Sequence, residues 1–108
     1  MKLEVLVKEY LIEIEVRKYT PKTIRGYRNG LNLFLRFCKD QLGVNEIEDI
    51  TLGTVRQFTK FMTDAGRRGT YINGLLKTLK SFLQYCYEEG YGDSIPKRIS
   101  SGAKKNGL

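Results

Sequence analysis

Apolar residues recur every three or four positions over four long stretches of this chain, and such spacing is typical of helices with one buried face. The predicted helices cover residues 3–16, 21–41, 52–65 and 71–89. No stretch alternates between apolar and polar residues for long enough to predict a strand. We therefore expect an all-α fold, a compact bundle of four main helices, to which the region after Ile95 can add a short fifth.

Each predicted helix begins and ends at residues that favour helix boundaries. A threonine hydroxyl can accept a hydrogen bond from a free amide at a helix start, and proline needs no donor at the first helical position. Glycine favours the end of a helix. The predicted caps are Thr20, which precedes Pro21, Thr51 and Thr70, and the predicted stops are Gly43, Gly66 and Gly90.

The apolar faces of the four helices define the expected core. Its predicted members are Leu3, Leu6, Val7, Tyr10, Leu11 and Ile14 in the first helix, Ile24, Tyr27, Leu31, Phe34, Leu35 and Cys38 in the second, Val55, Phe58, Phe61, Met62 and Ala65 in the third, and Ile72, Leu75, Leu76, Leu79, Phe82, Leu83 and Cys86 in the fourth. Val5, Ile12 and Val16 widen the apolar arc of the first helix, which fits a broader core face or a partner surface. Residues 44–50 are expected to form a polar connection.

Two glycines, Gly26 and Gly30, lie inside the second predicted helix. Each costs roughly 1 kcal/mol of helix stability relative to alanine. Close approach by another helix or by a nucleic-acid backbone would compensate for that cost, and the sequence leaves both explanations open.

Length and composition restrict the classes of protein that the chain can form. A chain of 108 residues can bury one self-sufficient core, so we expect one domain. It has no histidine, which removes the commonest general base and metal ligand, and we expect no cofactor and no metal site. The two cysteines lie in apolar surroundings and are expected to be reduced core residues rather than a disulfide.

The location of the protein is also suggested by the sequence. No apolar run approaches the roughly 18 residues that span a bilayer. The acidic residues within the first 16 positions are unlike a signal peptide. We expect a cytoplasmic protein with no membrane partner.

The formal net charge of +7 is unevenly distributed along the chain. Residues 17–39 hold seven basic residues and no acidic one, and residues 67–87 hold four basic residues and no acidic one. Residues 1–16 and 40–66, which contain the first and third predicted helices, are net acidic, by two and three charges. A solvated surface without a partner would intersperse the two signs, so the second and fourth helices are predicted to meet a polyanion, with nucleic acid favoured.

The two basic helices also begin alike, with hydroxyl and amide side chains. These are Tyr19, Thr20 and Thr23 in one helix and Thr70, Tyr71 and Asn73 in the other. Helix starts present free amides and a positive dipole end, which suit phosphate oxygens. Plain capping by each threonine is the simpler explanation, and the two roles are compatible.

Three short patterns carry a family resemblance. They are Thr20-Pro21-Lys22-Thr23-Ile24 followed by Tyr27, Leu31 and Phe34; Ile50-Thr51 with Val55 and Phe58; and Gly69-Thr70-Tyr71-Ile72-Asn73 followed by Leu76, Leu79, Lys80, Phe82 and Glu89-Gly90. In this order and spacing they resemble the N-terminal core-binding domain, called SAM-like, of phage-integrase-type tyrosine recombinases. The resemblance covers about residues 3–99.

The resemblance implies a role for each part of the chain. Residues 1–99 would form a core-binding helical domain whose second and fourth helices contact double-stranded DNA, and residues 100–108 would be a basic linker or tail toward a catalytic domain that this sequence lacks. The positions that match the family's DNA-facing places are Lys22, Thr23, Arg25, Gly26, Arg68, Thr70, Tyr71, Asn73, Lys77 and Lys80.

The implied function is that of a DNA-binding module for DNA integration and site-specific recombination, of bacterial, phage or mobile-element origin. No catalytic residue is expected in this chain, so it would not be an enzyme by itself. The implied partners are DNA, the catalytic domain of the same parent chain and other recombinase subunits in a synaptic complex. The alternatives are a helical protein-interaction domain that docks an acidic partner and an RNA-binding bundle.

Overall fold

The computed structural model describes residues 1–91 and confirms the all-α bundle of four main helices within that range. The helices are α1 (Leu3–Val16), α2 (Pro21–Phe37), α3 (Leu52–Asp64) and α4 (Gly69–Cys86). A π-helical turn, Cys38–Leu42, extends α2 and ends at Gly43, whose φ of 66° is left-handed. The segment Tyr87–Tyr91 continues α4 and is kinked at Gly90, whose φ of 92° is not helical. The short fifth helix and the basic tail predicted from the sequence lie outside the described residues.

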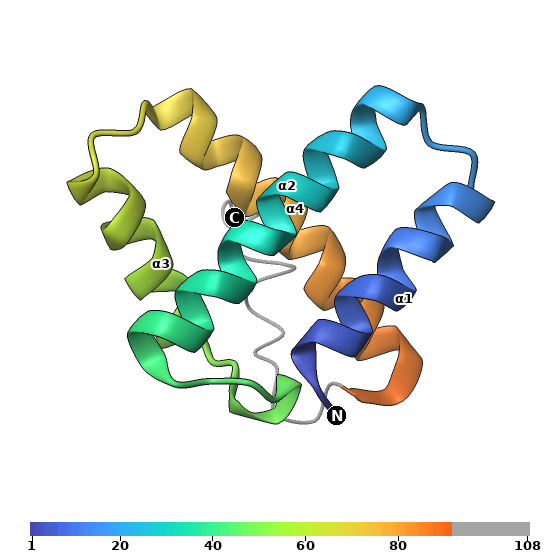
Figure 1. Ribbon diagram of the computed structural model, residues 1–108, viewed down its shortest axis with the longest axis horizontal. Coiled ribbons are helices and arrows are strands. Elements are labelled where there is room, and N and C mark those ends of the chain that lie inside the picture. The colour runs from blue at the N-terminus through green and yellow to red at the C-terminus, as the bar shows by residue number, and fades with distance from the viewer. Residues whose placement is uncertain (92–108) are drawn as a thin grey trace, which may run out of the picture.

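The bundle is built around the crossing of α2 and α4 (Figure 1). In this view α1 flanks α2 on the right and α3 flanks α4 on the left, and the starts of α2 and α4 lie at opposite upper ends. Gly30 is buried at the crossing, where an added Cβ would lie 3.2 Å from Leu75 Cδ2 and 3.7 Å from Thr78 Cγ2. Close approach by another helix therefore explains Gly30, whereas an added Cβ on Gly26 would have nothing within 4 Å.

Aromatic rings fill the centre of the core. Phe34, Phe58 and Phe82 are among its largest fully buried side chains. The Phe34 and Phe58 ring centroids are 5.2 Å apart in an edge-on arrangement, which joins α2 to α3. Tyr10 of α1 lies 5.7 Å from Phe82 of α4 in the same manner. One continuous core thus holds all four helices together.

Three expectations about the apolar faces are wrong. Phe61 is 40% exposed and covers the outer side of the Phe37 ring, 5.1 Å away, because Phe37, not assigned to the core from the sequence, occupies the inner place. Ala65 is exposed beyond the end of α3. The broader core face of α1 is absent, since Val5, Ile12 and Val16 are 40%, 60% and 69% exposed.

The connection between α2 and α3 is less polar in structure than in sequence. Ile47 and Ile50 are fully buried, and Ile47–Asp49 forms a single 3-10 turn. The amide of Ile47 donates to the carbonyl of Met1, and the amide of Leu3 donates to the carbonyl of Asn45. The prediction of a polar connection is therefore wrong for the two isoleucines, which anchor the turn in the core.

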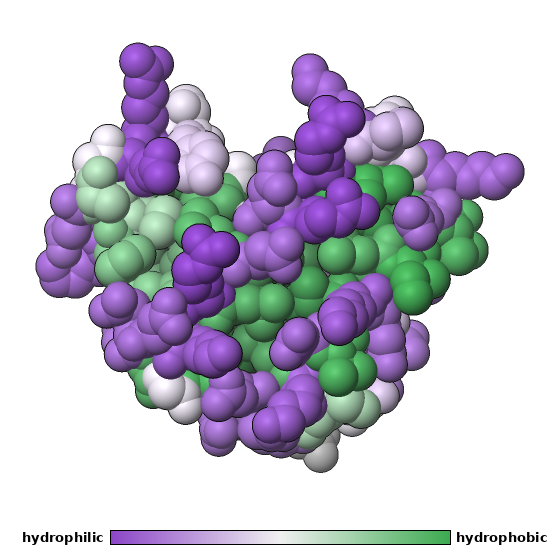
Figure 2. Space-filling model, in the orientation of Figure 1, coloured by the Kyte–Doolittle hydropathy of each residue, from purple (hydrophilic) through white to green (hydrophobic). Residues whose placement is uncertain are grey.

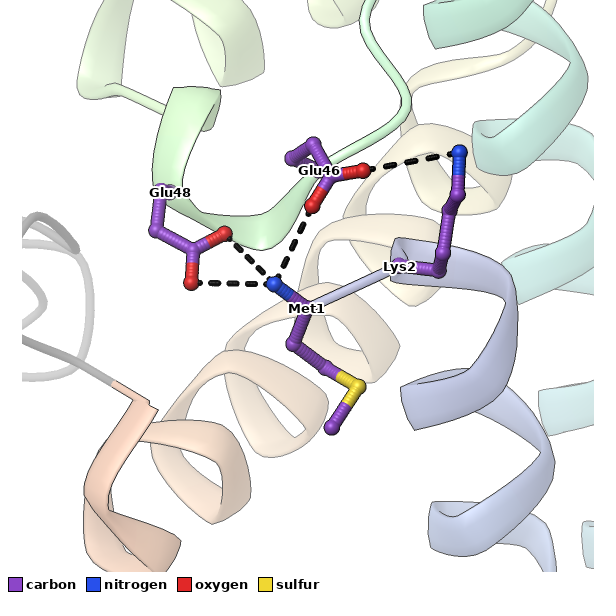
Figure 3. Close-up of polar contacts among 4 residues, drawn as sticks. All are labelled: Met1, Lys2, Glu46 and Glu48. Carbon is purple, nitrogen blue, oxygen red and sulfur yellow. Dashed lines mark hydrogen bonds and ion pairs between the residues drawn. The ribbon is translucent and has the colours of Figure 1, made fainter.

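Ion pairs reinforce the same junction (Figure 3). The amino group of Met1 lies 3.1 Å from a carboxylate oxygen of Glu46 and 3.0 Å from one of Glu48. Lys2 Nζ lies 3.5 Å from the other Glu46 oxygen. These hydrogen bonds raise the pKa of the Met1 amino group and lower the pKa of both carboxyls.

Two of the three predicted threonine caps are confirmed. The hydroxyl of Thr20 accepts a hydrogen bond of 3.2 Å from the amide of Thr23, and Thr51 caps α3 in the same way. Thr70 is not a cap, because α4 begins one residue earlier, at Gly69, and Arg68 occupies the cap position without a side-chain bond. None of the helices within residues 1–91 is long and apolar enough to cross a membrane.

Candidate nucleic-acid interface

The first half of α2 presents four of the ten residues predicted to contact DNA. Lys22, Thr23, Arg25 and Gly26 are all exposed. The Thr20 hydroxyl donates to the Thr23 hydroxyl over 2.8 Å, which leaves the hydrogen of the Thr23 hydroxyl able to donate outward. Because Pro21 and the Thr20 cap fix the start of α2, these side chains are presented together there, while the amide of Thr23 is taken up by the cap.

The other six residues lie on α4 and the residue before it. Arg68, Thr70, Tyr71, Asn73 and Lys77 are exposed, and Lys80 is half-buried. Tyr71 is held by Arg67, whose guanidinium lies 5.4 Å from the centre of the tyrosine ring. Arg67 was not among the predicted residues; it precedes α4, so its contact with Tyr71 depends on the path of the chain before the helix and not on helical spacing.

The structure brings part of the predicted set together and separates the rest. The α2 residues lie on the N-terminal side of the Gly30 crossing, with Lys22 about 12 Å from it along the helix axis. On α4, Lys77 and Lys80 flank Thr78 at the crossing, whereas Arg68 and Thr70 lie up to about 15 Å away, toward the helix start. Figure 2 shows hydrophilic side chains projecting from both upper ends of the molecule, with a hollow between them.

We call these ten residues the α2–α4 face. It contains five basic side chains and no acidic one, and none of the five takes part in an ion pair within residues 1–91. The ion pairs of the described residues lie elsewhere, on α1, on α3 and at the N-terminal junction. The positive charge of the α2–α4 face is therefore available to an anionic partner.

The described residues hold no cluster of metal ligands and no exposed thiol. No group of three His, Cys, Asp or Glu residues within positions 1–91 could hold a metal ion. Cys38 and Cys86 are free and buried, as predicted, and burial raises the pKa of each thiol to about 12. Burial likewise raises the pKa of Tyr10. These groups stay protonated near neutral pH and are poor nucleophiles.

Comparison with known proteins identifies the fold. The family model described as the phage integrase, N-terminal SAM-like domain, matches residues 7–90. The chain belongs to this family. The match spans α4 and most of α1, together with the whole of α2 and α3, so all the helices that form the core of this SAM-like domain are included.

Curated relatives agree with the family assignment. The chain is 30% identical over 99 residues to a tyrosine recombinase XerC of Thermodesulfovibrio yellowstonii, covering 91% of the chain and 31% of the relative. It is 26% identical over 95 residues to a tyrosine recombinase XerC of Oceanobacillus iheyensis, covering 87% of the chain and 31% of the relative. It is 26% identical over 95 residues to a tyrosine recombinase XerD of Staphylococcus haemolyticus, covering 87% of the chain and 32% of the relative.

These matches show that the SAM-like domain is homologous to the N-terminal region of such recombinases. The chain spans about a third of the length of each of these three relatives. No solved structure matches the chain significantly.

Proposed function

We propose that this SAM-like domain binds double-stranded DNA as the core-site-binding module of a site-specific tyrosine recombinase. The observation that carries the proposal is the α2–α4 face, whose five basic side chains are free of acidic partners within the described residues. Membership of the integrase family and homology to tyrosine recombinases support the same assignment.

The face binds mainly through phosphates. Lys22, Arg25 and Lys77 supply charge-assisted hydrogen bonds to phosphate oxygens, and such contacts fix position on a duplex without reading its sequence. Thr23 and Asn73, near the two helix starts, add neutral donors, and the first turn of α4, which has no side-chain cap, adds free amides. Only those side chains of α2 and α4 that reach into the major groove of the duplex read bases.

The module acts within a longer parent protein in this proposal. Residues 1–99 form the DNA-binding domain, and residues 100–108 lead as a basic linker to a catalytic domain, which supplies the residues for strand cleavage. Other recombinase subunits are further partners in integration and recombination. The proposed setting is the cytoplasm of a bacterium, where such a protein meets chromosomal, phage or mobile-element DNA.

A charge-removal pair on the α2–α4 face tests the proposal. Arg25→Ala with Lys77→Ala should weaken binding to a labelled duplex by about tenfold or more, because a hydrogen bond to a charged group contributes about 1.5–3 kcal/mol. The matched control is Arg56→Ala with Lys60→Ala, which removes one arginine and one lysine from the exposed side of α3. Fluorescence anisotropy measures binding, and circular dichroism checks that both variants remain folded.

An equal loss of affinity in both pairs would show that net charge, not the α2–α4 face, governs binding. A poly-glutamate peptide that binds the chain more tightly than any duplex does would favour the alternative function, a domain that docks an acidic protein.

A further inference from the structure

A groove lies between α1 and α2, beside the α2–α4 face and outside the residues assigned to it. Its volume is about 910 Å³. Half-buried and buried apolar residues of both helices line it, among them Val7 and Leu35, and polar side chains form its rim. On the α2 side the basic rim residues are Arg28, Arg36 and Lys39, of which the last lies in the π-helical turn that extends α2.

These three cations continue the basic side of α2 in a row. Arg28 follows Arg25 by three residues, and Arg25 follows Lys22 by three, so neighbours in this series lie on adjoining positions of the helix surface. Asn32 lies four residues after Arg28 and four before Arg36, on the same side of the helix, and also lines the groove. At a rise of 1.5 Å per residue, the row from Lys22 to Lys39 is about 25 Å long.

The charge of the row is uncompensated within the described residues. Arg28, Arg36 and Lys39 are exposed, and none of them makes an ion pair with a residue in positions 1–91. Of the two acidic residues that line the groove, Glu4 pairs with Lys8 at 3.9 Å, and Asp40 lies at the far end of the row. The three α2 cations are therefore the groove's free binding groups.

We propose that the α1–α2 groove is a second phosphate site, at which Arg28, Arg36 and Lys39 bind the sugar-phosphate backbone of the same duplex that the α2–α4 face holds. The inference rests on the proposed DNA binding. Each strand of a duplex carries one charge per about 3.4 Å of helix axis, so a row about 25 Å long can lie along several consecutive phosphates. Continuity of the row with Lys22 and Arg25 favours DNA over an acidic protein as the occupant.

The test compares the salt dependence of duplex binding in matched variants. The groove variant is Arg36→Gln with Lys39→Gln, and its control is Arg56→Gln with Lys60→Gln on α3, which removes the same two types of charge. Each phosphate contact contributes about −0.9 to the slope of log K against log salt concentration. The groove variant should therefore bind with a slope about 1.8 shallower than that of the unsubstituted chain, whereas the control keeps its slope.

Each other result counts against the inference. An unchanged slope in the groove variant, together with a shallower slope in Arg25→Ala with Lys77→Ala, overturns the groove site and leaves the proposed function standing. An equal change in the control overturns the groove site as well, because it shows a non-specific effect of net charge. If the unsubstituted chain binds no duplex, both proposals fail, and poly-glutamate then tests for an acidic protein partner.

Discussion

At the scale of single residues, Gly26 and Gly30 show how neighbouring positions of one helix serve different purposes. An added Cβ at Gly30 would meet Leu75 Cδ2 at 3.2 Å, and an added Cβ at Gly26 would meet nothing within 4 Å. Of these two positions, only Gly30 lies against a neighbouring helix. In the proposed complex, the open position at Gly26 lets a DNA backbone approach α2 closely.

Alanine substitutions distinguish these two roles. Gly26→Ala should raise the free energy of unfolding by about 0.5–1 kcal/mol, because alanine favours the helix and meets no neighbour. Gly30→Ala should raise the free energy of unfolding by less, or lower it, since Leu75 must shift to admit the methyl group. Urea unfolding measures both values, and a stability gain at Gly30 equal to that at Gly26 would contradict the close crossing.

Gly26→Ala also bears on DNA binding. If the DNA backbone approaches α2 at this position, the more stable variant should bind a duplex more weakly than the unsubstituted chain. Unchanged affinity in the stabilised variant would show that the backbone keeps its distance from Gly26.

At the scale of elements, the start of α1 and the connection before α3 stabilise each other through Met1, Glu46 and Glu48. The pKa of the Met1 amino group lies above its ordinary value of 8.0, so the contribution of this cation to stability is complete below pH 8 and is lost as the pH rises through the raised pKa. The pKa values of the two carboxyls lie below 4.5, so their contribution is complete above pH 4.5 and is lost as the pH falls through the lowered values.

The junction should therefore stabilise the fold most between about pH 4.5 and pH 8. Glu46→Gln with Glu48→Gln should lower the melting temperature within this window and make the pH profile flatter. Thermal unfolding followed by circular dichroism, from below pH 4.5 to above pH 8, measures both the lowered melting temperature inside the window and the weaker pH dependence outside it. Glu9→Gln with Glu15→Gln is the control, since these exposed α1 carboxylates make no ion pair within residues 1–91. If the melting temperature of the control depended on pH as weakly as that of the junction variant, the stabilising role assigned to Glu46 and Glu48 would be refuted.

Local signals predicted the helices well because each boundary depends on a few nearby residues. Thr20 and Pro21 define the start of α2, and Gly43 ends its extension, as the sequence indicated. Phe61 and the isoleucines of the α2–α3 connection were misjudged because their burial depends on partners far away in the sequence. Phe37 takes the inner place beside Phe61, and backbone hydrogen bonds with Met1 and Leu3 hold Ile47 and Asn45 in position.

At the scale of the whole molecule, charge counting selected α2 and α4, and the structure shows that these helices cross at Gly30. The sequence could not predict how far apart the two helix starts lie, because crossing geometry depends on packing between distant segments. For the same reason it could not reveal the α1–α2 groove, whose rim combines residues of two helices. Which residues of the α2–α4 face contact DNA stays a prediction.

The measurement that tests the central claim most directly is the salt dependence of duplex binding by the unsubstituted chain. Five phosphate contacts from the basic residues of the α2–α4 face predict a slope of log K against log salt concentration of about −4.5, and each contact in the α1–α2 groove makes it steeper by about 0.9. Fluorescence anisotropy titrations of a labelled duplex at several salt concentrations give this slope. A slope of about −4.5 or steeper is the expected result, and binding that is absent or insensitive to salt would contradict the account.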